Sequence, residues 1–169
     1  MKLIKPKFWD HKNLISLSLF PLSLITQFVI FLKKKFTKVS NFKIPIVCIG
    51  NIYIGGTGKT PLSILVSKEL SKIGKKPAII RKYYKDHKDE HSLIKENFNY
   101  LILNSNRISA IQEAENKNFD TAILDDGFQD YKIKKNLSII CFNSNFEGNG
   151  FVIPAGPLRE NLSSIKNAQ

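Results

Sequence analysis

Residues 50–60 read Gly-Asn-Ile-Tyr-Ile-Gly-Gly-Thr-Gly-Lys-Thr, a set of residue types that suits binding of a nucleoside triphosphate. Glycines let backbone N–H groups converge on phosphate oxygens, and the N-terminus of a following helix adds its positive dipole end. We expect Lys59 to reach the β- and γ-phosphates and the hydroxyl of Thr60 to hold Mg²⁺. The expected nucleotide-binding residues are Tyr53, Ile54, Gly55, Gly56, Thr57, Gly58, Lys59 and Thr60.

The match to a phosphate-binding loop departs from the usual pattern at one position. Tyr53 stands where the pattern has a glycine, so the segment is similar to the variant loops that carry two adjacent glycines. The alternative is an ordinary glycine turn between a strand and a helix. Three glycines in four residues cost backbone entropy that a simple connection does not require, which favours the phosphate-binding interpretation.

Two adjacent carboxylates follow a second apolar run, Thr121-Ala122-Ile123-Leu124. Mg²⁺ in nucleotide sites is held by one or two carboxylates together with phosphate oxygens and water. We therefore expect Asp125 to hold the metal, directly or through water, with Asp126 beside it. Two acids at the end of a strand also occur as a helix cap or a turn, but the presence of the glycine-rich loop favours the metal.

Apolar runs of strand type alternate along the chain with segments of helical period. Strands are expected at 44–49, 77–80, 100–103, 121–127 and 137–142, and helices from Pro61 to a cap at Gly74 and over 107–117. Residues 81–96 are charged, with no apolar face, and indicate a long exposed loop or an irregular helix. This order predicts an α/β fold of the P-loop NTPase type, with a largely parallel sheet and helices on both faces. Active groups would gather at the carboxyl ends of the strands.

The N-terminal 43 residues differ in composition from the rest of the chain. The net charge of the 169 residues is +12, and residues 1–43 hold nine lysines and one acidic residue. Residues 14–32 carry no charge, and at about 1.5 Å per residue they barely reach the thickness of a bilayer core. We expect two domains: an N-terminal amphipathic membrane-associated helix in 1–43 and a P-loop domain in 44–169.

Polar residues form one stripe on this expected helix: Lys12, Ser16, Ser23, Gln27 and Lys34. Pro21 lies inside and is expected to kink or split the helix. A polar stripe with lysines at the ends suits a helix lying in the membrane interface, its cations facing anionic headgroups. A membrane-spanning helix and a buried helix of a soluble protein are the alternatives.

Other residue types narrow the range of function. The basic residues border an apolar segment and are not interleaved with aromatic residues, so no nucleic-acid partner is expected. Cys48 and Cys141 lie in apolar runs and are expected to be buried free thiols of a reducing compartment. The histidines have no metal-ligand spacing, and His11, His87 and His91 are expected at the surface.

Three motifs in order resemble the N-terminal part of the tetraacyldisaccharide 4′-kinase family, the lipid A 4′-kinases. They are Gly50-Asn51 through Gly-Gly-Thr-Gly-Lys-Thr-Pro61, then Asp125-Asp126-Gly127-Phe128-Gln129, then Gly148-Asn149-Gly150 followed by Pro154-Ala155-Gly156-Pro157-Leu158-Arg159-Glu160. The proline-interrupted apolar N-terminus is also typical of that family, and the similarity covers nearly the whole chain.

The resemblance implies Mg²⁺-dependent transfer of the γ-phosphoryl group of ATP to the 4′-hydroxyl of a tetraacyldisaccharide 1-phosphate, at the cytoplasmic face of the bacterial inner membrane. It implies that Asp89, Lys59 and Asp126 are catalytic, with Asp89 as the base, and that Glu90 lies near the metal with Thr60 and Asp125. The substrate residues that it implies are Arg107, Gln129, Arg159 and Glu160.

Some features depart from the family. Its Arg-Gly-Tyr segment appears here as Arg81-Lys82-Tyr83, Lys88 replaces the glycine before the Asp-Glu pair, and the family is roughly twice this length. A separately encoded C-terminal half is therefore an expected partner. Two alternatives to the kinase are a membrane-associated variant P-loop ATPase and a non-catalytic nucleotide-binding remnant.

Overall fold

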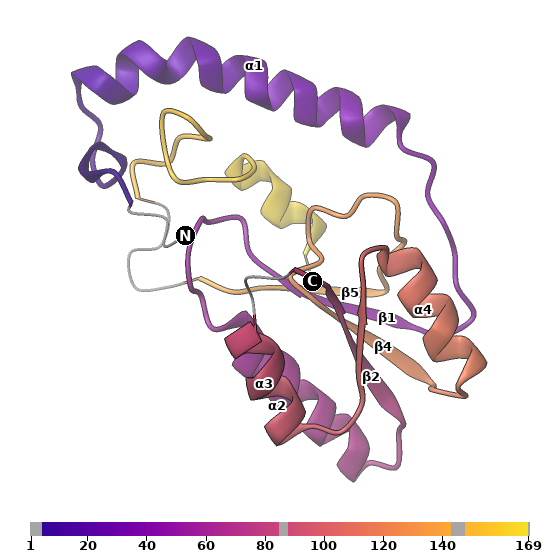
Figure 1. Cartoon of the computed structure of the whole chain (residues 1–169). Helices are drawn as coiled ribbons and strands as arrows, with labels where there is room; N and C mark the ends of the chain where they lie inside the picture. Colours follow the sequence, from indigo (N-terminus) through magenta and orange to yellow (C-terminus); the bar gives the residue numbers. More distant parts are fainter. Residues whose placement is uncertain (1–4, 85–87, 143–147, 169) are drawn as a thin grey trace.

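The computed structural model describes residues 5–84, 88–142 and 148–168, without the side chains of Lys88, Glu90 and Asn167. Its elements in chain order are η1 (Lys7–Trp9), α1 (Leu14–Phe36), β1 (Ile46–Gly50), α2 (Lys59–Lys72), β2 (Pro77–Lys82), α3 (Lys88–Asn97), β3 (Leu101–Asn104), α4 (Arg107–Asn116), β4 (Thr121–Asp125), β5 (Leu137–Ile140) and η2 (Leu162–Asn167). Figure 1 shows α1 along one side of the molecule, separated from the sheet by the segment 148–168.

The five strands form one parallel sheet in the order β3-β2-β4-β1-β5. Ile49 of β1 lies opposite Asp125 of β4, and Arg81 of β2 lies opposite Asp125 on the other side. The glycine-rich loop leaves the carboxyl end of β1 at the same edge. The predicted α/β fold with a parallel sheet is confirmed, and this edge is where the site residues meet.

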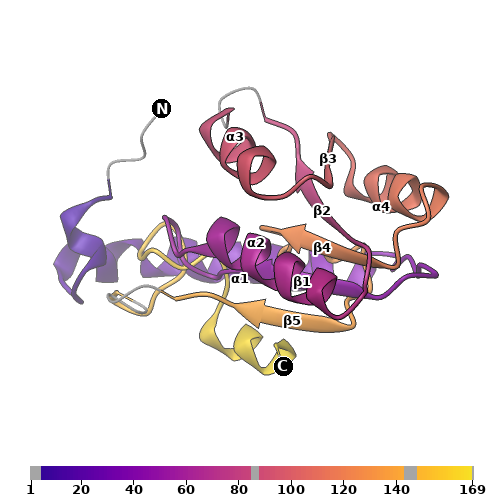
Figure 2. The same ribbon diagram turned by 90° about the horizontal axis from the view of Figure 1, so that it is seen from below.

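Helices cover both faces of the sheet, as Figures 1 and 2 show. On one face Ile64 of α2, Ile79 of β2 and Ile94 of α3 pack into a small core. On the other face Ala110 and Ile111 of α4 join a larger core that also contains residues of the 148–158 segment. Alternate residues of β2 serve the two cores, because successive strand side chains point to opposite faces.

The segment after β2 forms a regular helix, α3, and the prediction that it has no apolar face was wrong. Ile94 is fully buried, and Phe98, one residue beyond the helix, is also buried. His91 is buried too, with its ring stacked 5.8 Å from that of Tyr83, so the expected surface position of this histidine was also wrong. Two apolar residues four apart were too few to be recognised among the charges. His87 lies outside the described residues.

Two smaller expectations also need correction. The α1 helix runs from Leu14 to Phe36 through Pro21, so the proline does not split it. Cys48 is a buried free thiol, and burial raises its pKa to about 11. Cys141 lies one residue beyond β5 and is only half-buried, because β5 is at the edge of the sheet.

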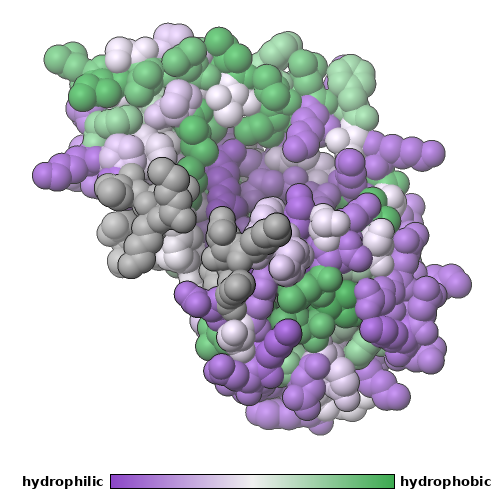
Figure 3. Space-filling model, viewed as in Figure 1, coloured by the Kyte–Doolittle hydropathy of each residue, from purple (hydrophilic) through white to green (hydrophobic). Residues whose placement is uncertain are grey.

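Most of the polar stripe of α1 faces the protein, whereas Lys12, ahead of the helix, is exposed. Ser16 and Ser23 are fully buried, and Lys34 forms an ion pair with Glu160. The outward side is apolar, and its exposed residues are Leu14, Ile15, Leu17, Leu22, Leu24, Ile25, Phe28, Val29, Phe31 and Phe36. Figure 3 shows this side as a continuous hydrophobic band over α1. This helix is also the one among the described residues that is long and apolar enough to cross a membrane.

Candidate functional site

The glycine-rich loop has a backbone that requires glycine at two positions. Gly55 has φ 135° and Gly58 has φ 75°, and Gly58 is the N-cap residue of α2. Non-glycine residues rarely adopt these angles. The Asn51 side-chain amide donates to the carbonyl of Tyr53 (2.7 Å) and to the hydroxyl of Thr57 (3.0 Å), which fixes the loop from within. The loop therefore presents its backbone at the start of a helix, as anion binding requires.

Tyr53 and Ile54 lie in the wall behind this loop. The side chain of Tyr53 is 2% exposed, and its backbone forms an isolated bridge with Leu158. The N–H of Ile54 donates to the carbonyl of Pro157 at 2.9 Å. Gly55, Gly56 and Gly58 are exposed. The part of the predicted set that faces solvent thus begins at Gly55.

Asp125 is fully buried and holds the start of α2 through hydroxyl groups. Its Oδ2 accepts from the Thr60 hydroxyl at 3.0 Å, and its Oδ1 accepts from the Ser63 hydroxyl at 3.2 Å. The Arg81 guanidinium also donates to Oδ2 and, at 3.0 Å, to the Thr60 oxygen. A buried carboxylate needs such a partner, since an unpaired charge in the protein interior is costly.

The hydrogen bonds of Thr60 decide whether these residues fit Mg²⁺. A hydroxyl has one proton and two lone pairs, and here the proton goes to Asp125 while one lone pair accepts from Arg81. One lone pair remains for a cation, so the donor set fits a metal held by Thr60 and phosphate oxygens. Because Oδ2 of Asp125 already accepts two bonds, the arrangement favours its acting through Thr60 or through water.

Asp126 turns away from the buried network toward the loop lysine and an arginine. Its Oδ1 lies 3.6 Å from Nζ of Lys59 and 3.2 Å from Nη1 of Arg159. Burial acts to raise the pKa of Asp126, but the positive charges of Lys59, Arg159 and Arg107 outweigh it and lower the pKa. Burial lowers the pKa of Lys59, as does Arg159, whereas Asp126 opposes them. The exposed end of the site is thus a compact cluster of charge.

The residues after the carboxylates need glycine for packing. A Cβ on Gly127 would lie 2.7 Å from Cβ of Leu124, and a Cβ on Gly50 would lie 2.5 Å from Cβ of Phe128. The close approach of this turn to β1 brings Gln129 to the loop, where its amide donates to the carbonyl of Asn51 at 2.8 Å. Both motifs are therefore parts of one packed unit.

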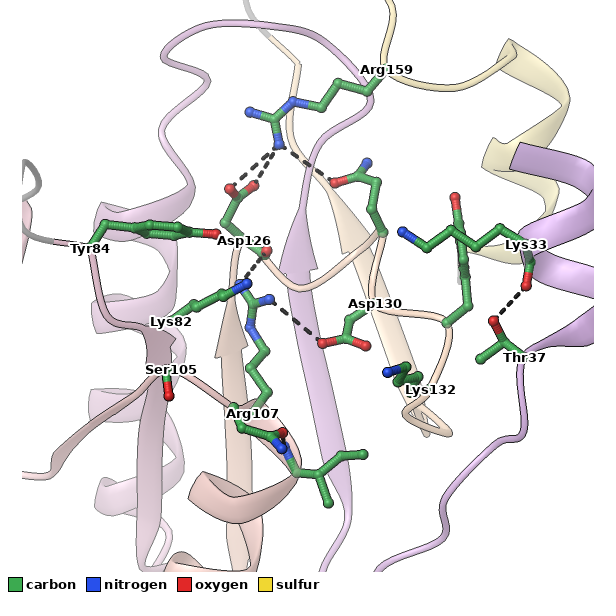
Figure 4. Close-up of a pocket in the computed structure, with 14 residues that line it drawn as sticks. Lys33, Thr37, Lys82, Tyr84, Ser105, Arg107, Asp126, Asp130, Lys132 and Arg159 are labelled. Atoms are coloured by element: carbon green, nitrogen blue, oxygen red, sulfur yellow. Dashed lines mark hydrogen bonds and ion pairs between the residues drawn. The ribbon is translucent and has the colours of Figure 1, made fainter. Parts of the chain in front are cut away.

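A hollow of about 620 Å³ adjoins this cluster (Figure 4). It is lined by Lys33, Thr37, Lys82, Tyr84, Ser105, Asn106, Arg107, Ile108, Asp126, Gln129, Asp130, Tyr131, Lys132 and Arg159. Lys33 enters from α1 and Thr37 from the residue that follows it, and Arg159 lies above Asp126 at the opposite end. Five of the lining side chains are basic and two are acidic, so the hollow suits an anionic ligand.

Most of the predicted site residues come together at this edge of the sheet. Arg107 donates to the carbonyl of Asp126 at 2.7 Å, and its Nη1 lies 3.7 Å from the carboxylate of Asp130. Asp89 lies apart, exposed on α3 and absent from the lining of the hollow. The side chain of Glu90 lies outside the described part of the chain. Glu160 is 1% exposed and does not line the hollow either.

Sequence reasoning missed Arg81, Ser63 and Lys33. Arg81 is the last buried residue of β2 and contacts two of the three predicted metal residues, Thr60 and Asp125. An arginine directly after an apolar run was the available signal. Ser63 follows Thr60 by three residues, the spacing that puts it on the same side of the helix. Lys33 reaches the site only because α1 folds over it, which no local pattern indicates.

Comparison with known proteins identifies relatives along nearly the whole chain. A tetraacyldisaccharide 4′-kinase of Pelagibacter ubique is 47% identical over 99% of this chain and 54% of its own length, and one of Ruthia magnifica is 33% identical over 92% and 58%. The crystal structure of LpxK from Aquifex aeolicus in complex with ATP matches with a TM-score of 0.77 at 25% identity, over 92% of this chain and 57% of that one.

The chain spans about half the length of the curated relatives that it matches. The family profile described as tetraacyldisaccharide-1-P 4′-kinase matches residues 15–169, which include the glycine-rich loop, both carboxylates and the Arg159 turn. On this match, the chain belongs to the tetraacyldisaccharide-1-P 4′-kinase family.

Proposed function

We propose that this chain takes part in the ATP- and Mg²⁺-dependent transfer of a phosphoryl group to the 4′-hydroxyl of a tetraacyldisaccharide 1-phosphate. One observation carries the proposal: Lys59 and Arg159 converge on Asp126 next to the Thr60–Asp125 pair, at the mouth of a cationic hollow. Family membership and the ATP complex of the Aquifex aeolicus protein support it.

The residues have distinct tasks in this proposal. The backbone of Gly55–Thr60 grips the β- and γ-phosphates, and Lys59 moves from Asp126 to the γ-phosphate as negative charge shifts onto the leaving oxygen. Bound Mg²⁺ would neutralise phosphate charge, held by Thr60 with Asp125 behind it. Asp126 and Arg159 would orient the acceptor end, with Arg107 and Gln129 on the wall. Asp89 stays our prediction for the base that accepts the proton of the 4′-hydroxyl, and Glu90 stays our prediction for a residue near the metal.

The same proposal assigns α1 to the bilayer. Its outward face is apolar while lysines stand at its C-terminal end, which suits burial in the interface of an anionic leaflet. A lipid acceptor explains why Lys33, at the C-terminal end of this helix, lines the hollow. We place the chain at the cytoplasmic face of the inner membrane, with a C-terminal half of the family's length as a partner.

Incubation with γ-labelled ATP, Mg²⁺ and the tetraacyldisaccharide 1-phosphate in mixed micelles tests the function. Label on the lipid, lost in Lys59→Ala, is the expected result. Free labelled phosphate alone would support the ATPase. Binding of ATP without turnover would leave a nucleotide-binding remnant, and either outcome would overturn the transferase proposal for this chain.

A further inference from the structure

Three side chains of the inner stripe of α1 make polar contacts with the segment 148–168. The Ser23 hydroxyl donates to the carbonyl of Val152 at 2.5 Å and accepts from the N–H of Ala155 at 3.1 Å. Gln27 accepts from the side-chain amide of Asn161 at 2.9 Å. The third side chain, Lys34, forms an ion pair with Glu160 at 2.5 Å. Polar groups thus connect α1 to the segment that carries Arg159.

Glu160 is the buried charged residue of this set. Its side chain is 1% exposed, and each carboxylate oxygen has a partner from a different part of the chain. Oε2 accepts from Lys34, and Oε1 accepts from the hydroxyl of Tyr131 at 2.6 Å. Lys34 also lies 4.9 Å from the ring centroid of Tyr131 and donates to the hydroxyl of Ser164 at 3.2 Å. Burial, followed by the Glu160 charge, raises the pKa of Tyr131.

The residue before Glu160 is the arginine of the site. The N–H of Arg159 donates to the carbonyl of Ile52 at 2.6 Å, and its guanidinium reaches Asp126 at 3.2 Å and Gln129 at 3.5 Å. A displacement of Lys34 must move or uncover the Glu160 carboxylate, since a buried charge cannot lose its partner cheaply. Through one peptide unit, that displacement reaches Arg159.

We propose that Glu160 is a positioning residue that couples the seating of α1 on a membrane to the placement of Arg159 over Asp126. Glu160 does not touch the ligand, in contrast to the substrate contact implied by the family resemblance. The inference rests on the proposed function for the membrane seating of α1 and for the identity of what Arg159 finally contacts. By reciprocity, a membrane that orders Arg159 must be bound more tightly when Arg159 is ordered.

Hydrogen exchange at the Arg159 amide tests the coupling without any nucleotide. The full chain is measured with and without vesicles of phosphatidylglycerol and phosphatidylcholine. We expect vesicles to slow this exchange at least roughly fivefold in the native chain, the lower end of typical coupling between sites. Lys34→Met should bind vesicles but lose the slowing of exchange. Lys34→Arg should keep it, because arginine retains the charge that pairs with Glu160. A lysine with a purely structural role would not give this pattern.

Lys35→Met is the matched control at saturating vesicle concentration, because it removes one cation from the same end of α1 and leaves the Lys34–Glu160 pair in place. It should respond as the native chain does. If Lys34→Met fails to fold, Glu160→Gln tests the coupling in its place, since it keeps the shape of the side chain and removes the buried charge. An undiminished vesicle response in the decisive variant, or a native chain whose Arg159 amide ignores vesicles, would overturn the proposal.

ATP affinity, measured separately by calorimetry on the same samples, distinguishes the two proposals. A chain that fails to bind ATP but shows the Lys34-dependent exchange response would disprove the proposed function and support the coupling. A chain that binds ATP but shows no exchange response would disprove the coupling and leave the proposed function standing.

Discussion

The helices α1 and α2 lie on opposite sides of the sheet and present opposite surfaces to their surroundings (Figure 1). The outer side of α2 includes the charged residues Lys68, Glu69 and Lys72, and its inner side packs on β1, β2 and β4. The outer side of α1 is apolar, and its inner side binds the protein through Ser23, Gln27 and Lys34. The comparison teaches that the chain has two exteriors, one suited to water and one to hydrocarbon, with the candidate site between them.

The sharpest way to break this comparison is to make the outer side of α1 like that of α2. Phe28 and Phe31 are 59% and 57% exposed. Replacing both with glutamate should weaken vesicle binding by roughly 100- to 10,000-fold, because burying each phenylalanine contributes about 1.5–3 kcal/mol. Vesicle co-sedimentation measures the change, and far-ultraviolet circular dichroism should stay unaltered. Undiminished sedimentation would show that α1 does not enter the bilayer through this face.

The second prediction concerns the start of α2. Lys59→Ala should weaken ATP binding roughly 10- to 150-fold, because a hydrogen bond to a charged group contributes about 1.5–3 kcal/mol. Isothermal titration with ATP and Mg²⁺ measures it. Lys68→Ala, an exposed lysine on the same helix, is the control and should bind as the native chain does. Equal ATP affinities of the two variants would show that the nucleotide does not bind at this loop.

The third prediction tests the inner side of α1. Ser23→Ala leaves the Val152 carbonyl and the Ala155 N–H without their buried partner. The free energy of unfolding should fall by about 1–3 kcal/mol, the cost of unsatisfied buried polar groups. Ser18→Ala, whose exposed hydroxyl bonds only within α1, should change it by less than about 0.5 kcal/mol. Urea unfolding compares them, and similar midpoints would mean that α1 is not fixed by its polar stripe.

The smallest expected effect is a pH dependence at Asp126. Because the folded pKa is lowered, the ionised carboxylate stabilises the fold above its unfolded pKa, about 3.9, and this contribution is lost as pH falls through the folded pKa. Asp126→Asn should therefore be less stable than the native chain at pH 7, by less than about 1 kcal/mol for a partly exposed pair. The difference should vanish in acid. A difference that persists at pH 2 would exclude the ion pairs as its cause.

Local sequence patterns were sufficient for the sheet and the loop. Each strand is a short apolar run, and the glycines at 55 and 58 have backbone angles that other residues avoid, so both signals lie within a few positions. The direction in which the stripe of α1 faces was not predictable in this way. Ser23 and Lys34 bond to residues more than a hundred positions away in the chain. The sequence pattern of a helix with one polar side is the same whether that side contacts lipid headgroups or the rest of the protein.

The site was predictable to the same depth. Lys59, Thr60 and Asp125 were predicted from the loop motif and from the end of an apolar strand. Arg81 reaches Asp125 because β2 pairs with β4, and the sequence alone does not give the order of the strands in the sheet. The family resemblance implied a substrate contact for both Arg159 and Glu160. Two consecutive side chains outside regular structure can point in opposite directions, and only the fold shows that Glu160 faces inward.

The inward polar stripe has a practical consequence for making a detergent-free form of this protein. Removal of residues 1–39 would leave Val152, Ala155 and Glu160 without their partners in α1. It would also expose the Glu160 carboxylate, which is now buried against Tyr131. Replacing the outer apolar residues of α1 with glutamate and lysine, while keeping Ser16, Ser23, Gln27 and Lys34, should yield a water-soluble molecule in which α1 still packs on the segment that carries Arg159.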